Sequence, residues 1–160
     1  MQATLVLERI ERRLSVDPIS DCDWLRTTAD TAEGHLRILA SMRYCEEDVR
    51  KYGAAQVRAW IAEDQRRYEA FGEGEWWYLD AYATAIIGVH LGEERIGQVR
   101  YCSMVLGGIE SDSPREYLDE VTAVLVTEVK EELRSRGFTD LDEVETPYAL
   151  SEHWIAAAIS

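Results

Sequence analysis

Residues 76–108 read WWYLDAYATAIIGVHLGEERIGQVRYCSMVLGG, a stretch rich in aromatic and β-branched side chains. From residue 76 to residue 87 the apolar side chains alternate between two faces, as they do in an extended strand. LGEERIG is typical of a hairpin connection, and IGQVRYCSMVLGG predicts a returning strand that ends at the two glycines. We therefore predict an antiparallel hairpin over about residues 75–106. Neither of its faces is wholly polar, which favours helices on one side and a partner or ligand on the other.

An amphipathic helix is predicted before this hairpin, over residues 54–71. The segment GAAQVRAWIAEDQRRYEAF spaces its apolar residues at the helical period and places charged residues on the opposite face. Glycines at positions 72 and 74 then end the pattern. The predicted inward-facing residues are Val57, Trp60, Ile61, Asp64, Tyr68 and Phe71.

A second amphipathic helix is predicted after the hairpin, over residues 114–136. Ser113 is suited to cap this helix and Pro114 to occupy its first position, while Glu116 at the third position would complete a capping box. Gly137 follows where a left-handed C-cap is needed. The predicted apolar stripe comprises Tyr117, Leu118, Val121, Val124, Leu125, Val129 and Leu133.

The ends of the chain complete the predicted architecture. Residues 3–9 fit a strand, with a short helix to residue 15 as the alternative, and residues 26–44 show helical spacing. After the second helix we expect a short edge strand and then a C-terminal helix following Pro147. The order helix, strand, strand, helix predicts an α+β fold with a small antiparallel sheet packed against the two amphipathic helices. One domain is expected over residues 1–160, and the organisation of residues 1–50 stays open.

Acidic residues dominate the charge, because 31 Asp and Glu against 17 Lys and Arg give a net charge of −14. Such a surface repels phosphates and anionic lipid, so neither direct nucleic-acid binding nor membrane-surface binding is predicted. A protein with a basic groove would instead be attracted over a long range. No apolar run is long enough to cross a bilayer. The three cysteines are widely spaced and form no CxxC, which is typical of reduced thiols and predicts a cytoplasmic protein.

The negative charge is concentrated in residues 110–145, which contain twelve acidic and four basic residues. Several of these acids avoid the apolar stripe of the second helix, so that helix would present a negative outer face. A face that serves only solubility is the alternative to a binding surface. Aromatic residues at the start of the hairpin would form an exposed patch if their sheet face is open. The predicted partner-binding residues are Glu110, Asp112, Glu116, Asp119, Glu120, Glu131, Glu132, Asp140, Asp142, Glu143, Trp76 and Tyr78.

Three kinds of chemical site can be considered. The loop GGIESDS is rich in glycine, but no GK[ST] follows and its acids would repel a phosphate, so a structural role is predicted. Glu110 and Asp112 could bind a hard cation, although no further ligands follow at EF-hand spacing. Cys102, His90 and Asp80 could meet across the hairpin and are the residue types that thiol chemistry needs. No motif supports either set, so we predict no enzyme, no metal and no cofactor.

A glycine pair, an IESDS turn and YLDEV opening an acidic helix follow one another from Gly107 to Val121. With WWYLDAYATAIIGV before it, this pattern resembles small acidic proteins of phages and other mobile elements, over about residues 60–138. That group is similar in kind to anti-CRISPR and antirestriction inhibitors, some of which present carboxylates in place of DNA phosphates. The resemblance implies a phage-borne protein that acts in the cytoplasm of the host cell.

These observations predict a non-enzymatic inhibitor that binds a basic, nucleic-acid-binding surface of a host defence nuclease complex, such as a CRISPR effector. Its contact surface would be the outer face of the second helix together with DLDEVE at residues 140–145. The first alternative is a small homodimeric structural or regulatory subunit that associates through the sheet. The second alternative is a small enzyme that uses Glu110 and Asp112, or Cys102 and His90.

Overall fold

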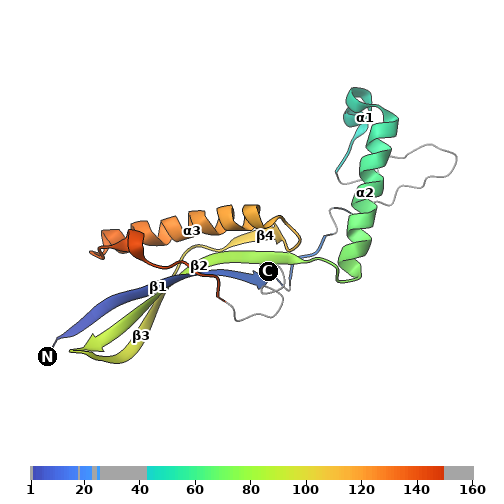
Figure 1. The fold of residues 1–160 in the computed structure, drawn as a ribbon. Helices are drawn as coiled ribbons and strands as arrows, with labels where there is room; N and C mark the ends of the chain where they lie inside the picture. The colour runs from blue at the N-terminus through green and yellow to red at the C-terminus, as the bar shows by residue number, and fades with distance from the viewer. Residues whose placement is uncertain (1, 18, 23–24, 26–42, 150–160) are drawn as a thin grey trace. The chain divides into compact units, whose positions relative to one another are not determined.

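The computed structural model describes residues 2–17, 19–22, 25 and 43–149 of the 160-residue chain (Figure 1). The chain divides into two compact units. Unit 1 combines Met1–Pro18 with Tyr78–Ser160, and unit 2 is Ile19–Trp77, so unit 2 is inserted between two parts of unit 1. The single-domain organisation stays a prediction, because two units joined by two chain connections can unfold together or separately.

Unit 1 is built on a four-stranded antiparallel sheet. Its strands are β1 (Ala3–Val16), β2 (Tyr78–Leu91), β3 (Glu94–Cys102) and β4 (Leu106–Glu110). β2 pairs with β1 along one edge, and with β3 and then β4 along the other. The predicted hairpin is β2 and β3, and the predicted α+β fold with a small antiparallel sheet is confirmed.

The predicted returning strand is interrupted at Ser103, which separates β3 from β4. The Ser103 N–H donates to the Ala83 carbonyl oxygen, and the Ala83 N–H donates to Ser103 Oγ, both at 2.9 Å. The Ser103 hydroxyl thus accepts the Ala83 N–H, which a backbone carbonyl oxygen would accept in a regular ladder. The prediction that the glycine pair ends the strand is wrong, because Gly107 and Gly108 lie within β4.

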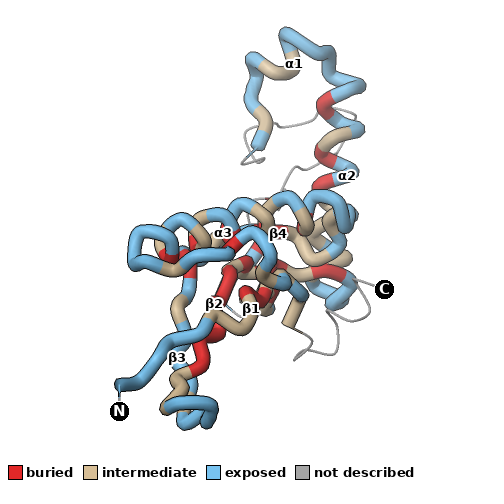
Figure 2. Tube along the Cα trace, turned by 60° about the vertical axis from the view of Figure 1, so that its left-hand side comes forward, coloured by how far each residue is buried: buried red, intermediate tan, exposed pale blue. Residues whose placement is uncertain are grey.

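The helix α3 (Arg115–Ser135) packs on one face of the sheet, against β1 and β2. Arg12 of β1 is opposite Ala83 of β2, and its side chain reaches α3. Ala83 and the alternate residues of β2 on either side of it therefore lie on the sheet face that α3 covers. Ala81, Ala83 and Ala85 on this side are fully buried, and their small side chains let the helix approach the sheet closely. Figure 2 shows buried residues gathered along β2 and the adjoining part of α3. The buried residues of α3 are Leu118, Thr122, Leu125, Val126, Val129 and Leu133.

The buried stripe of α3 differs in phase from the predicted one. Tyr117 and Val124 were expected inside, but they are 47% and 65% exposed. Thr122 and Val126 are buried instead. A threonine is tolerated there because its hydroxyl donates to the Leu118 carbonyl oxygen at 2.9 Å, which satisfies the donor within the helix.

The two ends of α3 are built differently. The predicted capping box is wrong: Pro114 is the N-cap residue, and no side chain caps the helix there. The first accepting carbonyl is that of Pro114, so Ser113 lies one residue too early for its hydroxyl to act as the cap. At the other end Gly137 has a φ of 93°, as predicted, and its N–H donates to the Arg134 carbonyl oxygen. The Phe138 N–H donates to that of Leu133, which completes a Schellman motif.

The chain after α3 covers part of the outer edge of β1. Following the 3-10 turn η4 (Leu141–Glu143), residues 145–149 run parallel to β1. The Ile10 N–H donates to the Glu145 carbonyl oxygen at 3.0 Å, and the Arg12 N–H donates to that of Pro147 at 2.8 Å. This pairing agrees with the predicted edge strand, and β1 itself is a strand, not the alternative short helix. Residues 150–160, where a C-terminal helix was predicted, and residues 26–42 lie outside the described residues.

Unit 2 contains α1 (Glu46–Tyr52) and α2 (Ala54–Gly72). The predicted helix over residues 54–71 is confirmed, and Val57, Ile61 and Asp64 are its buried residues. Burial raises the pKa of the Asp64 carboxyl, although Arg43 donates to it at 2.6 Å and acts in the opposite direction. The predicted packing of this helix on the sheet concerns the relation between the two units and stays a prediction.

Candidate partner-binding surface

Three exposed carboxylates lie along the outer face of α3. Glu116 and Glu120 are one helical turn apart, and Glu131 follows three turns after Glu120. At 1.5 Å per residue, Glu131 lies about 16 Å along the helix axis from Glu120. Because α3 is fixed on the sheet by its buried stripe, these carboxylates are held at a defined spacing.

Two other predicted acids on α3 are engaged within the protein. The Tyr148 hydroxyl donates to Asp119 Oδ1 at 2.6 Å, and Arg115 Nε lies 3.6 Å from Asp119 Oδ2. Arg136 Nε donates to Glu132 Oε1 at 2.7 Å. Neither carboxylate is as available to a partner as those of the three exposed glutamates.

The acids beyond α3 lie around its C-terminal end. Asp140, Asp142 and Glu143 are exposed and line a shallow cavity of about 270 Å³ with Arg134. The nearest Asp142 oxygen is 3.9 Å from Arg134 Nη2, which is a weak ion pair. At the other end of the helix, Glu110 is half-buried in β4 and Asp112 is exposed in the following turn.

The predicted aromatic anchors are not exposed. Trp76 is 1% exposed and Tyr78 is 6% exposed, so the prediction that they form a surface patch is wrong. In unit 2 the Trp76 indole N–H donates to the Arg67 carbonyl oxygen at 2.9 Å, and its ring packs edge-on against Phe71. Tyr78 is the first residue of β2, where it pairs with Glu110 of β4.

A different apolar patch lies on the same face as the exposed carboxylates. Tyr117 and Val124 are exposed on α3, two helical turns apart. Met104 and Val105 are 61% and 57% exposed in the link between β3 and β4. The Met104 N–H donates to Glu128 Oε1 at 3.2 Å, which holds this link beside the helix one turn beyond Val124.

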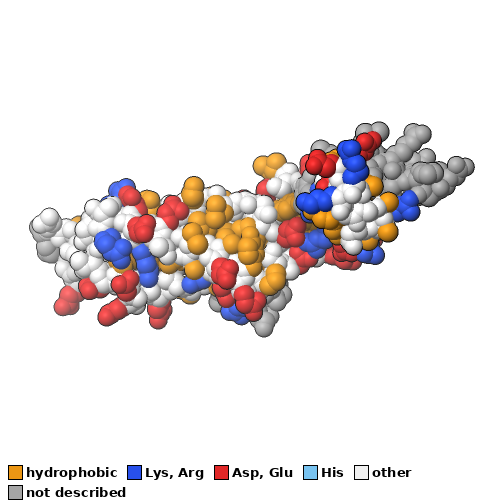
Figure 3. All heavy atoms as spheres, turned by 90° about the horizontal axis from the view of Figure 1, so that it is seen from above, with side chains coloured by type: hydrophobic (Ala, Val, Ile, Leu, Met, Phe, Trp, Pro, Cys, Tyr) orange, Lys and Arg blue, Asp and Glu red, His pale blue; other side chains and the backbone are white. Residues whose placement is uncertain are grey.

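Viewed onto this face, hydrophobic side chains gather over α3 and acidic side chains lie around them (Figure 3). We call this combination the α3 outer surface. Sequence reasoning missed its apolar part, because alternation assigned Met104 and Val105 to a strand and the helical period assigned Tyr117 and Val124 to the core. The α3 outer surface consists of Met104, Val105, Glu116, Tyr117, Glu120, Val124 and Glu131.

The structure does not bring together the Cys102 and His90 pair considered from the sequence. Cys102 is opposite Thr84, whereas His90 is opposite Arg95 near the far end of β2. Thr84 and His90 are six residue steps apart along β2, about 20 Å at 3.3 Å per residue, so the thiol and the imidazole do not meet. Within the described part of the chain, no group of three His, Cys, Asp or Glu side chains is placed to hold a metal ion. Glu110 and Asp112 therefore lack a third such ligand among the described residues.

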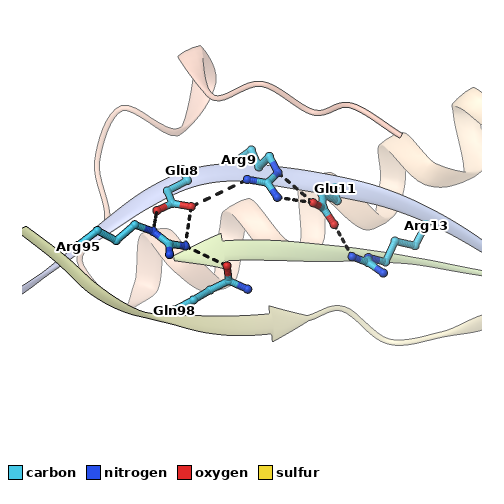
Figure 4. Close-up of polar contacts among 6 residues, drawn as sticks. All are labelled: Glu8, Arg9, Glu11, Arg13, Arg95 and Gln98. Carbon is cyan, nitrogen blue, oxygen red and sulfur yellow. Dashed lines mark hydrogen bonds and ion pairs between the residues drawn. The ribbon is translucent and has the colours of Figure 1, made fainter. Parts of the chain in front are cut away.

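The sheet face away from α3 carries a row of ion pairs (Figure 4). Arg9 and Arg13 both donate to the buried Glu11 carboxylate, which is 8% exposed as a residue. Burial by itself raises the pKa of Glu11, but these two arginines outweigh it and hold the pKa below its ordinary value. At the other end Arg95 reaches from β3 across β2 to Glu8 of β1. The middle of this face is thus occupied by the protein's own ion pairs.

Gly88 lets the Glu8–Arg95 ion pair cross β2. A Cβ atom at Gly88 would collide with Glu8 Oε1 and lie 2.8 Å from His90 Nε2. The hydrogen bond from Arg95 is the main cause that lowers the pKa of Glu8. Because this pKa is lower in the folded state, the pair stabilises the fold at neutral pH and the contribution is lost as the pH falls.

The change Gly88→Ala is therefore expected to displace the Glu8 carboxylate and return its pKa toward the ordinary value. An NMR titration of the Glu8 carboxyl group measures this shift. The same substitution in a Glu8→Ala background is the control: its effect on the free energy of unfolding should be smaller there. An equal effect in both backgrounds would contradict the role assigned to Gly88.

Comparisons with known proteins give no assignment for this chain. No protein-family model, no curated protein and no solved structure matches it. The resemblance to small acidic mobile-element proteins therefore stays a prediction. In the described part of the chain, no helix is long and apolar enough to span a membrane.

Proposed function

We propose that this protein is a non-enzymatic inhibitor whose α3 outer surface binds a basic, nucleic-acid-binding surface of a host defence nuclease complex. The observation that carries the proposal is the pairing of exposed carboxylates with exposed apolar side chains on one rigid helix face. The resemblance described above supports the phage or mobile-element setting and the choice of a nuclease as the partner.

The two kinds of side chain would contribute differently to binding. Glu116, Glu120 and Glu131 would attract a basic groove and speed association, with a rate that falls as salt is added. Tyr117 and Val124 would lose water on docking, and buried aromatic side chains supply much of the affinity at protein interfaces. The exposed apolar side chains of this surface lie together, and grouped apolar side chains mark interaction sites more often than singly scattered ones do.

The carboxylates would occupy positions that nucleic-acid phosphates take in the free nuclease. Their row along α3, continued by Asp140 and Glu143 beyond its end, gives an extended negative surface. The net charge of −14 adds long-range attraction to a positive channel and repels nucleic acid that competes for it. DNA mimicry is therefore the mechanism that we propose for the inhibition.

The test is a triple charge reversal, Glu116→Lys, Glu120→Lys and Glu131→Lys. Against purified restriction and CRISPR nuclease complexes, the reversal is expected to weaken binding at least about a hundredfold, because like charges then face each other. Isothermal titration at several salt concentrations measures both the affinity and its salt dependence. The reversal should also flatten the salt dependence.

A matched control reverses Glu73, Glu75 and Glu93, which are exposed and lie outside the α3 outer surface. Both triple variants change the net charge equally, so both should lose equal affinity for polylysine, a probe of net charge alone. Only the α3 variant should lose affinity for a nuclease. The proposal fails if the two variants weaken nuclease binding equally, or if none of the complexes binds the unmodified protein.

A further inference from the structure

The outer edges of β1 and β3 differ in whether another segment pairs with them. The edge of β1 is paired with residues 145–149 over its second half. Among the described residues, no strand or loop pairs with the outer edge of β3. An unpaired edge offers its N–H and C=O groups to another strand, and proteins usually block such an edge with proline, charge, a bulge or a covering segment.

The backbone groups that β3 offers can be identified from its register. The Ser103 N–H points to β2, since it donates to the Ala83 carbonyl oxygen. Backbone groups alternate in direction along a strand, so those of Tyr101 and Val99 also point to β2. The N–H and C=O groups of Gln98, Arg100 and Cys102 therefore point outward from the sheet.

The usual protections are weak over this part of β3. The strand contains no proline and no lysine, and Arg100 is the one charged residue from Gly97 to Cys102. The Arg95 side chain extends over β2, where it donates to Glu8 and to Gln98 Oε1. Its charge therefore does not lie at the outer edge of β3. The register shift of β3 lies at Ile96, which leaves Gly97 to Cys102 regular. Val99 is 48% exposed on this regular segment.

We propose that β3 pairs antiparallel with β3 of a second copy of this chain, about a two-fold axis at Val99. This inference goes beyond the proposed function and depends on different residues. The chemistry of β3 selects the occupant, because one register of the strand with itself satisfies charge, hydrogen bonding and packing together. Two-fold symmetry is the commonest symmetry of homodimers.

In the proposed register the two Val99 side chains are directly opposite, with Cβ atoms about 5 Å apart. Each Gln98 forms main-chain hydrogen bonds with Arg100 of the second copy, so the arginine faces a neutral residue. Gly97 faces Tyr101 of the second copy, whose ring can cover the glycine. Moving the axis to Arg100 would set two arginines opposite each other, and moving it to Gln98 would pair Arg100 with the irregular Ile96.

The proposed dimer has one continuous sheet. Residues that face each other in an antiparallel pair share a sheet face, so α3 of both copies would lie on the same side. The α3 outer surface would then be present twice on one side of the dimer. The residues proposed to pair, Gly97 to Tyr101, are not among those of that surface.

The test replaces the outward N–H donor of β3 with Arg100→Pro. Because this N–H does not pair with β2, the substitution should leave the fold intact and abolish the dimer. The control Arg100→Ala keeps the N–H and should remain dimeric. Sedimentation velocity over a concentration series, with circular dichroism to monitor folding, measures both results.

Three outcomes would overturn the proposal: an unmodified protein that stays monomeric at the highest concentration, a dimeric Arg100→Pro variant, or a monomer whose β3 edge is taken by a strand of another protein. If Arg100→Pro does not fold, amide hydrogen exchange of Gln98 and Arg100 replaces it. Protection of these amides should rise with protein concentration, and protection independent of concentration would refute the pairing. The α3 charge-reversal variant should still dimerise, which separates this result from failure of the proposed function.

Discussion

Replacing Arg12 with methionine is expected to lower the free energy of unfolding by about 3 kcal/mol. Arg12 Nε donates to the Thr146 carbonyl oxygen at 3.0 Å, and Arg12 Nη1 donates to the Asp119 carbonyl oxygen and to Thr122 Oγ1, both at 3.2 Å. One side chain on β1 thus joins the strand to α3 and to the C-terminal segment. Its guanidinium also lies 5.7 Å from the centre of the Tyr148 ring.

The loss is large because several groups lose their partner together. Methionine keeps the apolar stem of the side chain but supplies no N–H donors, so the carbonyl oxygens of Asp119 and Thr146 are left without this partner. Chemical denaturation monitored by circular dichroism measures the change. The control Arg134→Met removes a mostly exposed arginine of α3 and should change the free energy of unfolding by no more than about 0.5 kcal/mol. Equal effects of the two substitutions would contradict the role of Arg12.

Replacing Leu125 with alanine is expected to lower the free energy of unfolding by about 3 kcal/mol, because the removed side chain leaves a cavity under α3. Leu125 is 1% exposed, on the buried side of the helix that packs on β2 and its alanines. Those alanines are already small, so the space left by the leucine cannot be filled by neighbouring side chains moving in.

The neighbouring substitution Val124→Ala is the matched control. Val124 is 65% exposed, and alanine favours a helix more than valine does, so the change should be within about 0.5 kcal/mol of zero. Thermal and chemical denaturation of both variants measure the difference. Comparable losses would show that the helix packs in the phase predicted from the sequence, with Val124 inside.

The hairpin of β2 and β3 and the two long helices were predictable because their apolar residues repeat at the periods of those structures. The phase of α3 was not, because Thr122 is polar in sequence but is satisfied by Leu118 within its own helix. The break at Ser103 was also hidden, since a serine hydroxyl that replaces a carbonyl leaves no periodic signal. The full length of β1 was not predicted, because its apolar residues fit neither the strand period nor the helical period cleanly. Its charged residues Arg9, Glu11 and Arg13 instead pair with one another along one face of the strand.

The candidate surface was predictable in charge and only partly in its residues. Counting acids along the chain located the negative segment, because net charge needs no structure. Which carboxylates stay available depends on contacts with residues far along the chain, such as Tyr148 on Asp119. The exposed apolar residues could not be foreseen, because hydrophobic side chains in a regular pattern are normally assigned to the core.

The insertion of unit 2 has a consequence for how the protein is made. The Asp17 N–H donates to the Tyr78 carbonyl oxygen at 2.9 Å, so β1 and β2 come together at the two ends of the inserted segment. During synthesis β1 leaves the ribosome first, and it cannot pair with β2 until all of unit 2 has been made. Closing so long a loop has an entropic cost, which becomes smaller if unit 2 has already become compact. We therefore expect unit 2 to fold first and the sheet of unit 1 to form last.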